Sequence, residues 1–248
     1  MSSTSESGHA INLANFDTLI SFVKGYGEVY NPTKNSIKVE SLETIFVNSK
    51  QAIEAVDNVK PANTNAVSAR KVAFAPLSKL ITRVNNAIKA TDTTQQVDDT
   101  VKTIVRKLQG TRASARISAE EKATLEAEGK EVNQSSDSQM SFDNRLANFY
   151  KLIMLLKSIP EYNPNEEDLK ISALTALYED LEAKNKTVIE TSIPLSNARI
   201  KRDEVMYKPL TGLVDVACDT KVYIKSVFGA SSPQYKQVSK LAFKSLAK

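Results

Sequence analysis

An internal repeat constrains this 248-residue sequence more than any other feature. A shift of 132 to 133 residues brings one half of the chain onto the other and places the Tyr-Asn-Pro tripeptide at 30–32 on the same tripeptide at 162–164, after a one-residue gap. Chance matching of amphipathic helices does not readily supply this tripeptide with two further prolines in step. The matched positions are Phe16, Leu19, Ile20, Lys24 and Glu28 with Phe149, Leu152, Ile153, Lys157 and Glu161, and Pro61, Val72, Pro76, Leu77 and Leu80 with Pro194, Val205, Pro209, Leu210 and Leu213.

Apolar residues in each copy recur at a helical period. They are spaced 4, 3, 4 and 3 residues apart, which is typical of a helix and not of a strand. The same spacing suits long helices packed nearly antiparallel in a bundle. The series, apolar except at Ser49 and Asn185, is Leu42, Phe46, Ser49, Ile53 and Val56 in the first copy, and Leu174, Tyr178, Leu181, Asn185 and Val188 in the second.

Two pairs of prolines punctuate the repeats. Pro61 and Pro194 are expected to mark a turn into the third helix of each copy. Pro76 and Pro209 lie inside a helical pattern, where a proline removes one backbone hydrogen bond and kinks or breaks the helix. Because both copies carry this second proline, the same bend is expected twice.

The predicted fold is all-α: an elongated helical bundle of two internally duplicated units with long antiparallel, Pro-kinked helices. The expected divisions are a flexible tail at 1–14, a first helical unit at 15–110 and a second at 142–248. A polar connector at 111–141, partly helical at most, joins them. The pattern leaves open whether both units share one core.

Charge alternates along the chain although the net charge is only +4. Residues 1–59 carry a net −3 and residues 60–116 a net +8. Residues 117–182 carry a net −8 and residues 199–248 a net +6. In both halves an acidic stretch is therefore followed by a basic one.

Three interpretations of this charge pattern compete. Acidic and basic helices can neutralise each other within one bundle. Alternatively, basic ends can meet acidic ends of a neighbouring copy, which gives filaments or rings. Thirdly, a basic face can bind nucleic acid or an anionic surface, although these stretches have few interleaved aromatic residues. The candidate interaction surface is Arg106, Lys107, Arg112, Arg116, Lys236, Lys240 and Lys244.

Side chains that carry catalysis or bind metals are scarce. His9 is the only histidine and Cys218 the only cysteine, so a Ser-His-Asp triad, a Cys-His pair and a multi-His or multi-Cys zinc site have no sequence support. No dinucleotide or phosphate-loop motif is present. We therefore expect no catalytic, cofactor-binding or metal-binding residues and no enzyme activity. Cys218 is expected to be a buried or half-buried structural residue.

The opening residues have no basic and apolar signal-peptide regions, and the chain has no run of 18 apolar residues to span a membrane. A single cysteine fits a reducing compartment. The expected location is the cytoplasm by default, with export without a signal peptide left open.

Three segments of the chain carry a family resemblance. They are Ser138 to Arg145 (SQMSFDNR), Pro194 to Arg199 (PLSNAR) and Val227 to Gln237 (VFGASSPQYKQ). The chain resembles a group of uncharacterised all-helical proteins common in Bacteroidota. This resemblance implies a bacterial source and brings no activity, cofactor or site residue with it.

These patterns predict a non-enzymatic structural or interaction protein, with a protein partner or a second copy as its ligand. Two similar surfaces on one chain favour bivalent contact, and the complementary segments suit self-association. One alternative is a protein that binds nucleic acid or an anionic surface. A second is a toxin-like helical protein that inserts into membranes, for which Leu152 to Leu156 is the best apolar segment.

Overall fold

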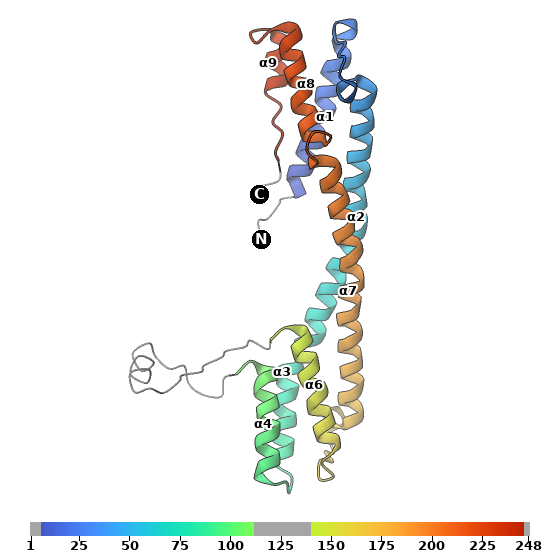
Figure 1. Cartoon of the computed structure of the whole chain (residues 1–248). Coiled ribbons are helices and arrows are strands. Elements are labelled where there is room, and N and C mark those ends of the chain that lie inside the picture. Colours follow the sequence, from blue (N-terminus) through green and yellow to red (C-terminus); the bar gives the residue numbers. More distant parts are fainter. Residues whose placement is uncertain (1–5, 112–139, 246–248) are drawn as a thin grey trace, which may run out of the picture. The chain divides into compact units, whose positions relative to one another are not determined.

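The computed structural model describes residues 6–111 and 140–245. Within these ranges the regular elements are α-helices and short 3₁₀ helices, and no strand occurs. The all-helical prediction is therefore confirmed for this part of the chain (Figure 1). The elements are α1 (Glu6–Gly25), η1 (Gly27–Val29), η2 (Asn35–Ile37), α2 (Val39–Phe74), α3 (Leu77–Lys89), α4 (Gln95–Gln109), α6 (Phe142–Lys157), η3 (Glu167–Leu169), α7 (Ile171–Tyr207), α8 (Leu213–Phe228) and α9 (Pro233–Ser239).

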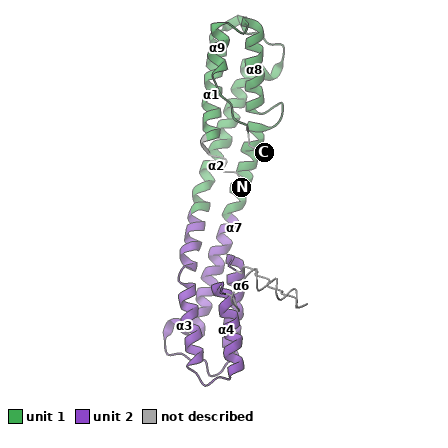
Figure 2. Ribbon diagram, turned by 90° about the vertical axis from the view of Figure 1, so that its left-hand side faces the viewer, with its two compact units in different colours: residues 1–64, 191–248 green, residues 65–190 purple. Residues whose placement is uncertain are grey.

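The chain divides into two compact units, which Figure 2 colours separately. Unit 1 comprises residues 1–64 and 191–248, and unit 2 comprises residues 65–190. The long helices α2 and α7 each contribute one part to each unit. These units differ from the two sequence repeats, because each unit combines the first half of one repeat with the second half of the other.

Unit 1 has a core built from both ends of the chain. Apolar residues of α1, including Phe16 and Leu19, are fully buried against Leu213 and Ala217 of α8. The side chain of Asn12 on α1 brackets the C-terminal segment: its Nδ2 donates to the Lys244 carbonyl at 2.8 Å, and its Oδ1 accepts from the Lys244 N–H at 2.9 Å.

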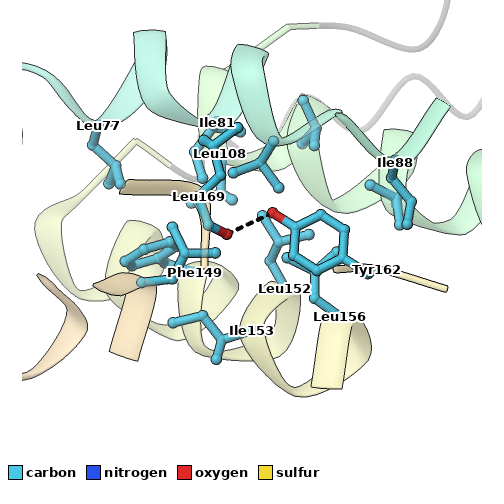
Figure 3. Close-up of a cluster of buried hydrophobic side chains, with 14 of the residues drawn as sticks. Leu77, Ile81, Ile88, Leu108, Phe149, Leu152, Ile153, Leu156, Tyr162 and Leu169 are labelled. Atoms are coloured by element: carbon cyan, nitrogen blue, oxygen red, sulfur yellow. Dashed lines mark hydrogen bonds between the residues drawn. The ribbon is translucent and has the colours of Figure 1, made fainter. Parts of the chain in front are cut away.

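Unit 2 has a separate core of the same kind, shown in Figure 3. Helix α6 contributes Phe149 and Leu152, which are both fully buried. Ile81 of α3 and Leu108 of α4 close the other side of this cluster. Burying each such side chain stabilises the fold by about 1.5–3 kcal/mol, so apolar packing of α3, α4 and α6 holds unit 2 together.

The predicted turns at Pro61 and Pro194 are wrong. Both prolines lie inside continuous helices, Pro61 in α2 and Pro194 in α7. A proline inside a helix leaves the carbonyl four residues earlier without its helical N–H. Both prolines are exposed, so water can hydrate that carbonyl and the helix continues. The breaks occur instead at Pro76, which caps α3, and near Pro209, between α7 and α8.

The register between the two repeats changes at this break. Helices α2 and α7 end at matched positions of the repeat, Phe74 and Tyr207. Helix α3 then begins at Leu77, whereas α8 begins at Leu213 and not at Leu210, the sequence match of Leu77. Leu77 and Leu210 are therefore matched in sequence but not equivalent in the structure: Leu77 is 1% exposed and Leu210 is 75% exposed. Three additional residues lengthen the loop before α8.

The ends of the chain also differ from expectation. Helix α1 begins at Glu6, so most of the predicted 1–14 tail is helical. His9 is buried there, and its Nδ1 lies 2.6 Å from the Tyr207 hydroxyl. Helix α9 ends at Ser239 and has 7 residues, whereas α4, the last helix of the first repeat, has 15. The predicted connector at 111–141 lies mainly outside the described residues.

Candidate interaction site

The Tyr-Asn-Pro turn of unit 2 is anchored by a buried tyrosine. The Tyr162 hydroxyl donates to the Leu169 carbonyl of η3 at 2.8 Å (Figure 3). The matching Tyr30 in unit 1 donates to the Ile37 carbonyl at 2.7 Å, also seven residues along the chain. Burial is the main cause that raises the pKa of Tyr162 to about 12, because it disfavours the phenolate, and the nearby carboxylates of Glu166 and Asp168 raise it further.

An ion pair joins this turn to α3. The Arg83 guanidinium forms two hydrogen bonds with the Asp168 carboxylate, one of them from Nη2 to Oδ1 at 3.1 Å. This hydrogen bonding and the charge of Asp168 raise the pKa of Arg83 above its ordinary value. Both side chains are about half exposed. The ion pair therefore fixes the orientation of the turn but adds little to the free energy of unfolding, because water screens exposed charges.

Beside this ion pair lies a surface hollow of about 470 Å³, wholly within unit 2. Its lining includes Ala87 of α3, Ala90 directly after this helix, and Tyr162, which is only 5% exposed. Its rim carries the amides of Asn86, Asn163 and Asn165, which can both donate and accept hydrogen bonds. A concave apolar wall with a few convergent polar groups is a typical binding site for a small group.

The residues of the predicted basic surface are divided between the two units. Arg106 and Lys107 lie in the last turn of α4, in unit 2. Lys236 and Lys240 lie on or directly after α9, and Lys244 follows them, all in unit 1. Lys107 and these three lysines are exposed, and Arg106 is half-buried. Arg112 and Arg116 lie outside the described residues.

The prediction for Cys218 is wrong, because this residue is exposed. The buried face of α8 runs through Ala217, Thr220 and Ile224. Of the two valines one helical turn from Cys218, Val214 is buried and Val222 is 66% exposed. Partial burial is nevertheless the main cause that raises the pKa of the Cys218 thiol. A raised pKa means less thiolate, so the site does not activate this cysteine as a nucleophile.

The predicted membrane-inserting segment belongs to a core. Leu152, Ile153 and Leu156 are at most 1% exposed within unit 2. No helix among residues 6–111 and 140–245 combines the length and apolar character needed to cross a bilayer. In the same part of the chain, no group of three or more His, Cys, Asp or Glu side chains is placed to hold a metal ion.

Sequence reasoning missed the hollow. The Tyr-Asn-Pro turn was recognised as a repeat marker, but the two alanines that line the hollow beside it, Ala87 and Ala90, carry no chemical signal of their own. The alanines stand out only when α3 and α8 are aligned by their buried residues, with Leu77 on Leu213, because Ala87 then falls on the larger Tyr223. Comparisons with protein-family profiles, with curated proteins and with solved structures find no match to this chain.

Proposed function

We propose that this chain is a non-enzymatic interaction protein and that the hollow of unit 2 is where it binds a protein partner. The observation that carries this proposal is the hollow itself, with an alanine-lined wall and an amide-bearing rim. Amide side chains of this kind suit the hydrogen-bonding groups of a peptide backbone. The buried tyrosine hydrogen bond holds one wall in a fixed conformation, which lowers the entropy cost of binding.

The distribution of charge supports a different protein as partner more than a second copy. Each unit combines an acidic segment of one repeat with a basic segment of the other. Unit 1 holds 15 basic and 11 acidic residues, and unit 2 holds 18 of each. Inside unit 2 an ion pair joins the two kinds of segment, from Arg83 of the basic segment to Asp168 of the acidic one. We therefore favour internal neutralisation among the three interpretations of the charge pattern.

We also propose that the two repeats arose by duplication. The support is the equivalent tyrosine hydrogen bond in each copy, over the same seven-residue separation. The order of elements around it is similar in both copies: a helix, a turn, a 3₁₀ helix (η2 or η3), a long helix with an internal proline, and two further helices. The first copy has one additional 3₁₀ helix, η1, before its turn.

A photo-crosslinking experiment tests the binding proposal. A benzophenone-bearing amino acid replaces Asn86 on the rim of the hollow, and irradiation takes place in the native cells. The matched control carries the same amino acid at Val222, the equivalent position on α8, which is 66% exposed. We expect a discrete covalent adduct with one protein from position 86 and none from position 222. The same products from both positions, or none from either, would refute the proposal.

Light scattering after size exclusion tests whether the partner is a second copy of this chain or a different protein. We expect a monomer at both physiological and high salt. An oligomer that dissociates at high salt would instead show association between copies through exposed charges, because salt screens such contacts.

A further inference from the structure

The two repeats place an aromatic pair at the same point of each unit. At an offset of 133 residues, His9 falls on Phe142 and Tyr207 falls on Phe74. Both pairs pack edge-to-face: the ring centroids of Phe74 and Phe142 lie 4.9 Å apart in unit 2, and those of His9 and Tyr207 lie 5.5 Å apart in unit 1. The same contact is therefore made by two hydrocarbon rings in unit 2 and by two titratable rings in unit 1.

The pair of unit 1 carries a hydrogen bond that two phenylalanines cannot form. The Nδ1 atom of His9 lies 2.6 Å from the Tyr207 hydroxyl, and the Nδ2 of Asn12 donates to the same hydroxyl oxygen at 3.4 Å. Because this oxygen already accepts from Asn12, the phenol proton is directed at Nδ1, which is an acceptor in a neutral ring with its proton on Nε2. His9 is only 3% exposed, and a buried site of this kind suits a neutral ring.

The same network holds the C-terminal segment, residues 241–245, on α1. This segment has no regular secondary structure, so side chains anchor it. Asn12 brackets the backbone of Lys244 with two hydrogen bonds, and the Nδ2 of Asn15 donates to the Ala242 carbonyl at 2.7 Å. One amide side chain, that of Asn12, thus contacts both the Tyr207 hydroxyl and the C-terminal segment.

A proton on His9 disrupts this arrangement. The imidazolium carries a hydrogen on both ring nitrogens, so Nδ1 changes from an acceptor to a donor. The Tyr207 hydroxyl oxygen then has two donors directed at it, and its own proton loses its acceptor. A positive charge also enters a site that water does not reach. Both changes cost free energy, and movement of the Tyr207 hydroxyl displaces the Asn12 amide that holds the C-terminal segment.

The other charged groups near this end of α1 keep their charge over the same pH range. Histidine is the side chain whose ordinary pKa places its charge change between pH 5 and 8, and His9 is the only one in the sequence. Burial is the main cause that raises the pKa of the Tyr207 phenol, which therefore stays protonated. The charged residues on the elements of unit 1 include Glu6 of α1, Lys60 of α2, Arg202 and Asp203 of α7, Asp215 of α8 and Lys244.

We propose that protonation of His9 releases residues 241–245 from α1 and uncovers the apolar surface around Phe16. The ring of Phe243 packs edge-to-face on that of Phe16, which is fully buried, with 6.5 Å between the ring centroids. The C-terminal segment therefore covers this surface while His9 is neutral. This device belongs to unit 1 and does not depend on the hollow of unit 2.

NMR of the ¹³C,¹⁵N-labelled full chain between pH 8 and pH 5 tests the proposal. The single histidine gives one Cε1–H signal that reports its ionisation. We expect the amides of residues 241–245 to move toward random-coil shifts with the midpoint of this titration, and the nuclear Overhauser contacts between Phe16 and Phe243 to disappear. The ratio of released to bound segment should rise by up to about tenfold per pH unit, because release is coupled to the uptake of one proton.

Two variants without the imidazole provide the controls. His9→Phe combined with Tyr207→Phe reproduces the ring pair of unit 2 and should keep the C-terminal segment bound from pH 8 to pH 5. His9→Gln removes only the titratable ring and should also abolish the pH dependence. The amide spectrum of α8 shows whether each variant is folded, and either variant alone is sufficient for the comparison.

Four outcomes would overturn the proposal. The first is a C-terminal segment that stays bound while His9 becomes protonated, and the second is an imidazole that stays neutral down to pH 5. The third is the same release in a folded variant that has no imidazole. The fourth is simultaneous loss of the α1 and α8 amide signals, which would show unfolding of the whole unit in place of release of the segment.

Discussion

Replacing Tyr162 by phenylalanine should change stability in a direction that depends on pH. At neutral pH the variant leaves the Leu169 carbonyl without the phenol donor that it has at 2.8 Å. Removing one partner of a buried hydrogen bond costs about 1–2 kcal/mol. Tyr162 is only 5% exposed, so water does not readily replace its hydroxyl. We therefore expect the Tyr162→Phe variant to be less stable than the wild type at pH 7.

At alkaline pH the order should reverse. The pKa of Tyr162 is about 12 in the folded chain, against an ordinary value of 10.0. Between these values the unfolded chain loses the phenol proton while the folded chain retains it, so the free energy of unfolding falls as the pH rises. The loss is about 1.4 kcal/mol per pH unit, or roughly 2 kcal/mol by pH 12. Phenylalanine has no proton to lose, so the two stability curves should cross near pH 11.

Urea unfolding, followed by circular dichroism at pH 7, 9, 10 and 11, measures this crossing. Tyr150→Phe is the matched control, because Tyr150 is 47% exposed and its variant should stay within about 0.5 kcal/mol of the wild type at pH 7. Lysine ionisation affects all three chains alike. A difference between the wild type and Tyr162→Phe that stays constant from pH 7 to pH 11 would refute the assigned burial of this phenol.

Three further predictions concern unit 1. Asn12→Ala should cost about 1 kcal/mol and accelerate hydrogen exchange at the Lys244 amide, because the bracket around that backbone is lost; unchanged exchange would contradict it. Leu210 has a left-handed φ of 69° and is 75% exposed, so Leu210→Gly should stabilise the chain by about 0.5–1 kcal/mol, and a lower thermal midpoint would argue against this strain. Cys218 should react fully with Ellman's reagent without denaturant, at a rate that rises with pH because its pKa is raised; protection until unfolding would place it in the core.

The helical class and the main turns could be predicted from sequence because they depend on local signals. The 3.6-residue spacing of apolar side chains and the Tyr-Asn-Pro turn act within a few residues. The turn predicted at Pro61 was wrong, because this proline lies on an exposed helix face. Water can hydrate the carbonyl that lacks a helical N–H there, so the helix continues.

The composition of the units could not be predicted, because it depends on pairing between distant segments. The repeat predicted helical units at 15–110 and 142–248 and left open whether they share one core; each compact unit of the structure takes residues from both ranges. The hollow was hidden for a related reason. Three additional residues before α8 shift the register, so Ala87 corresponds to Tyr223 only once the buried faces of both helices are known.

The discontinuity of unit 1 has a consequence for protein synthesis. Unit 2 is one uninterrupted stretch, 65–190, and all of its residues are available once the ribosome has passed its end. Unit 1 is completed only by residues 191–248. The apolar face of α1, with Phe16 and Leu19, therefore lacks its α8 packing partners during most of translation. Exposed apolar surface of this kind is prone to aggregation and attracts chaperones, so a nascent chain stalled before α8 should bind them more than the finished protein does.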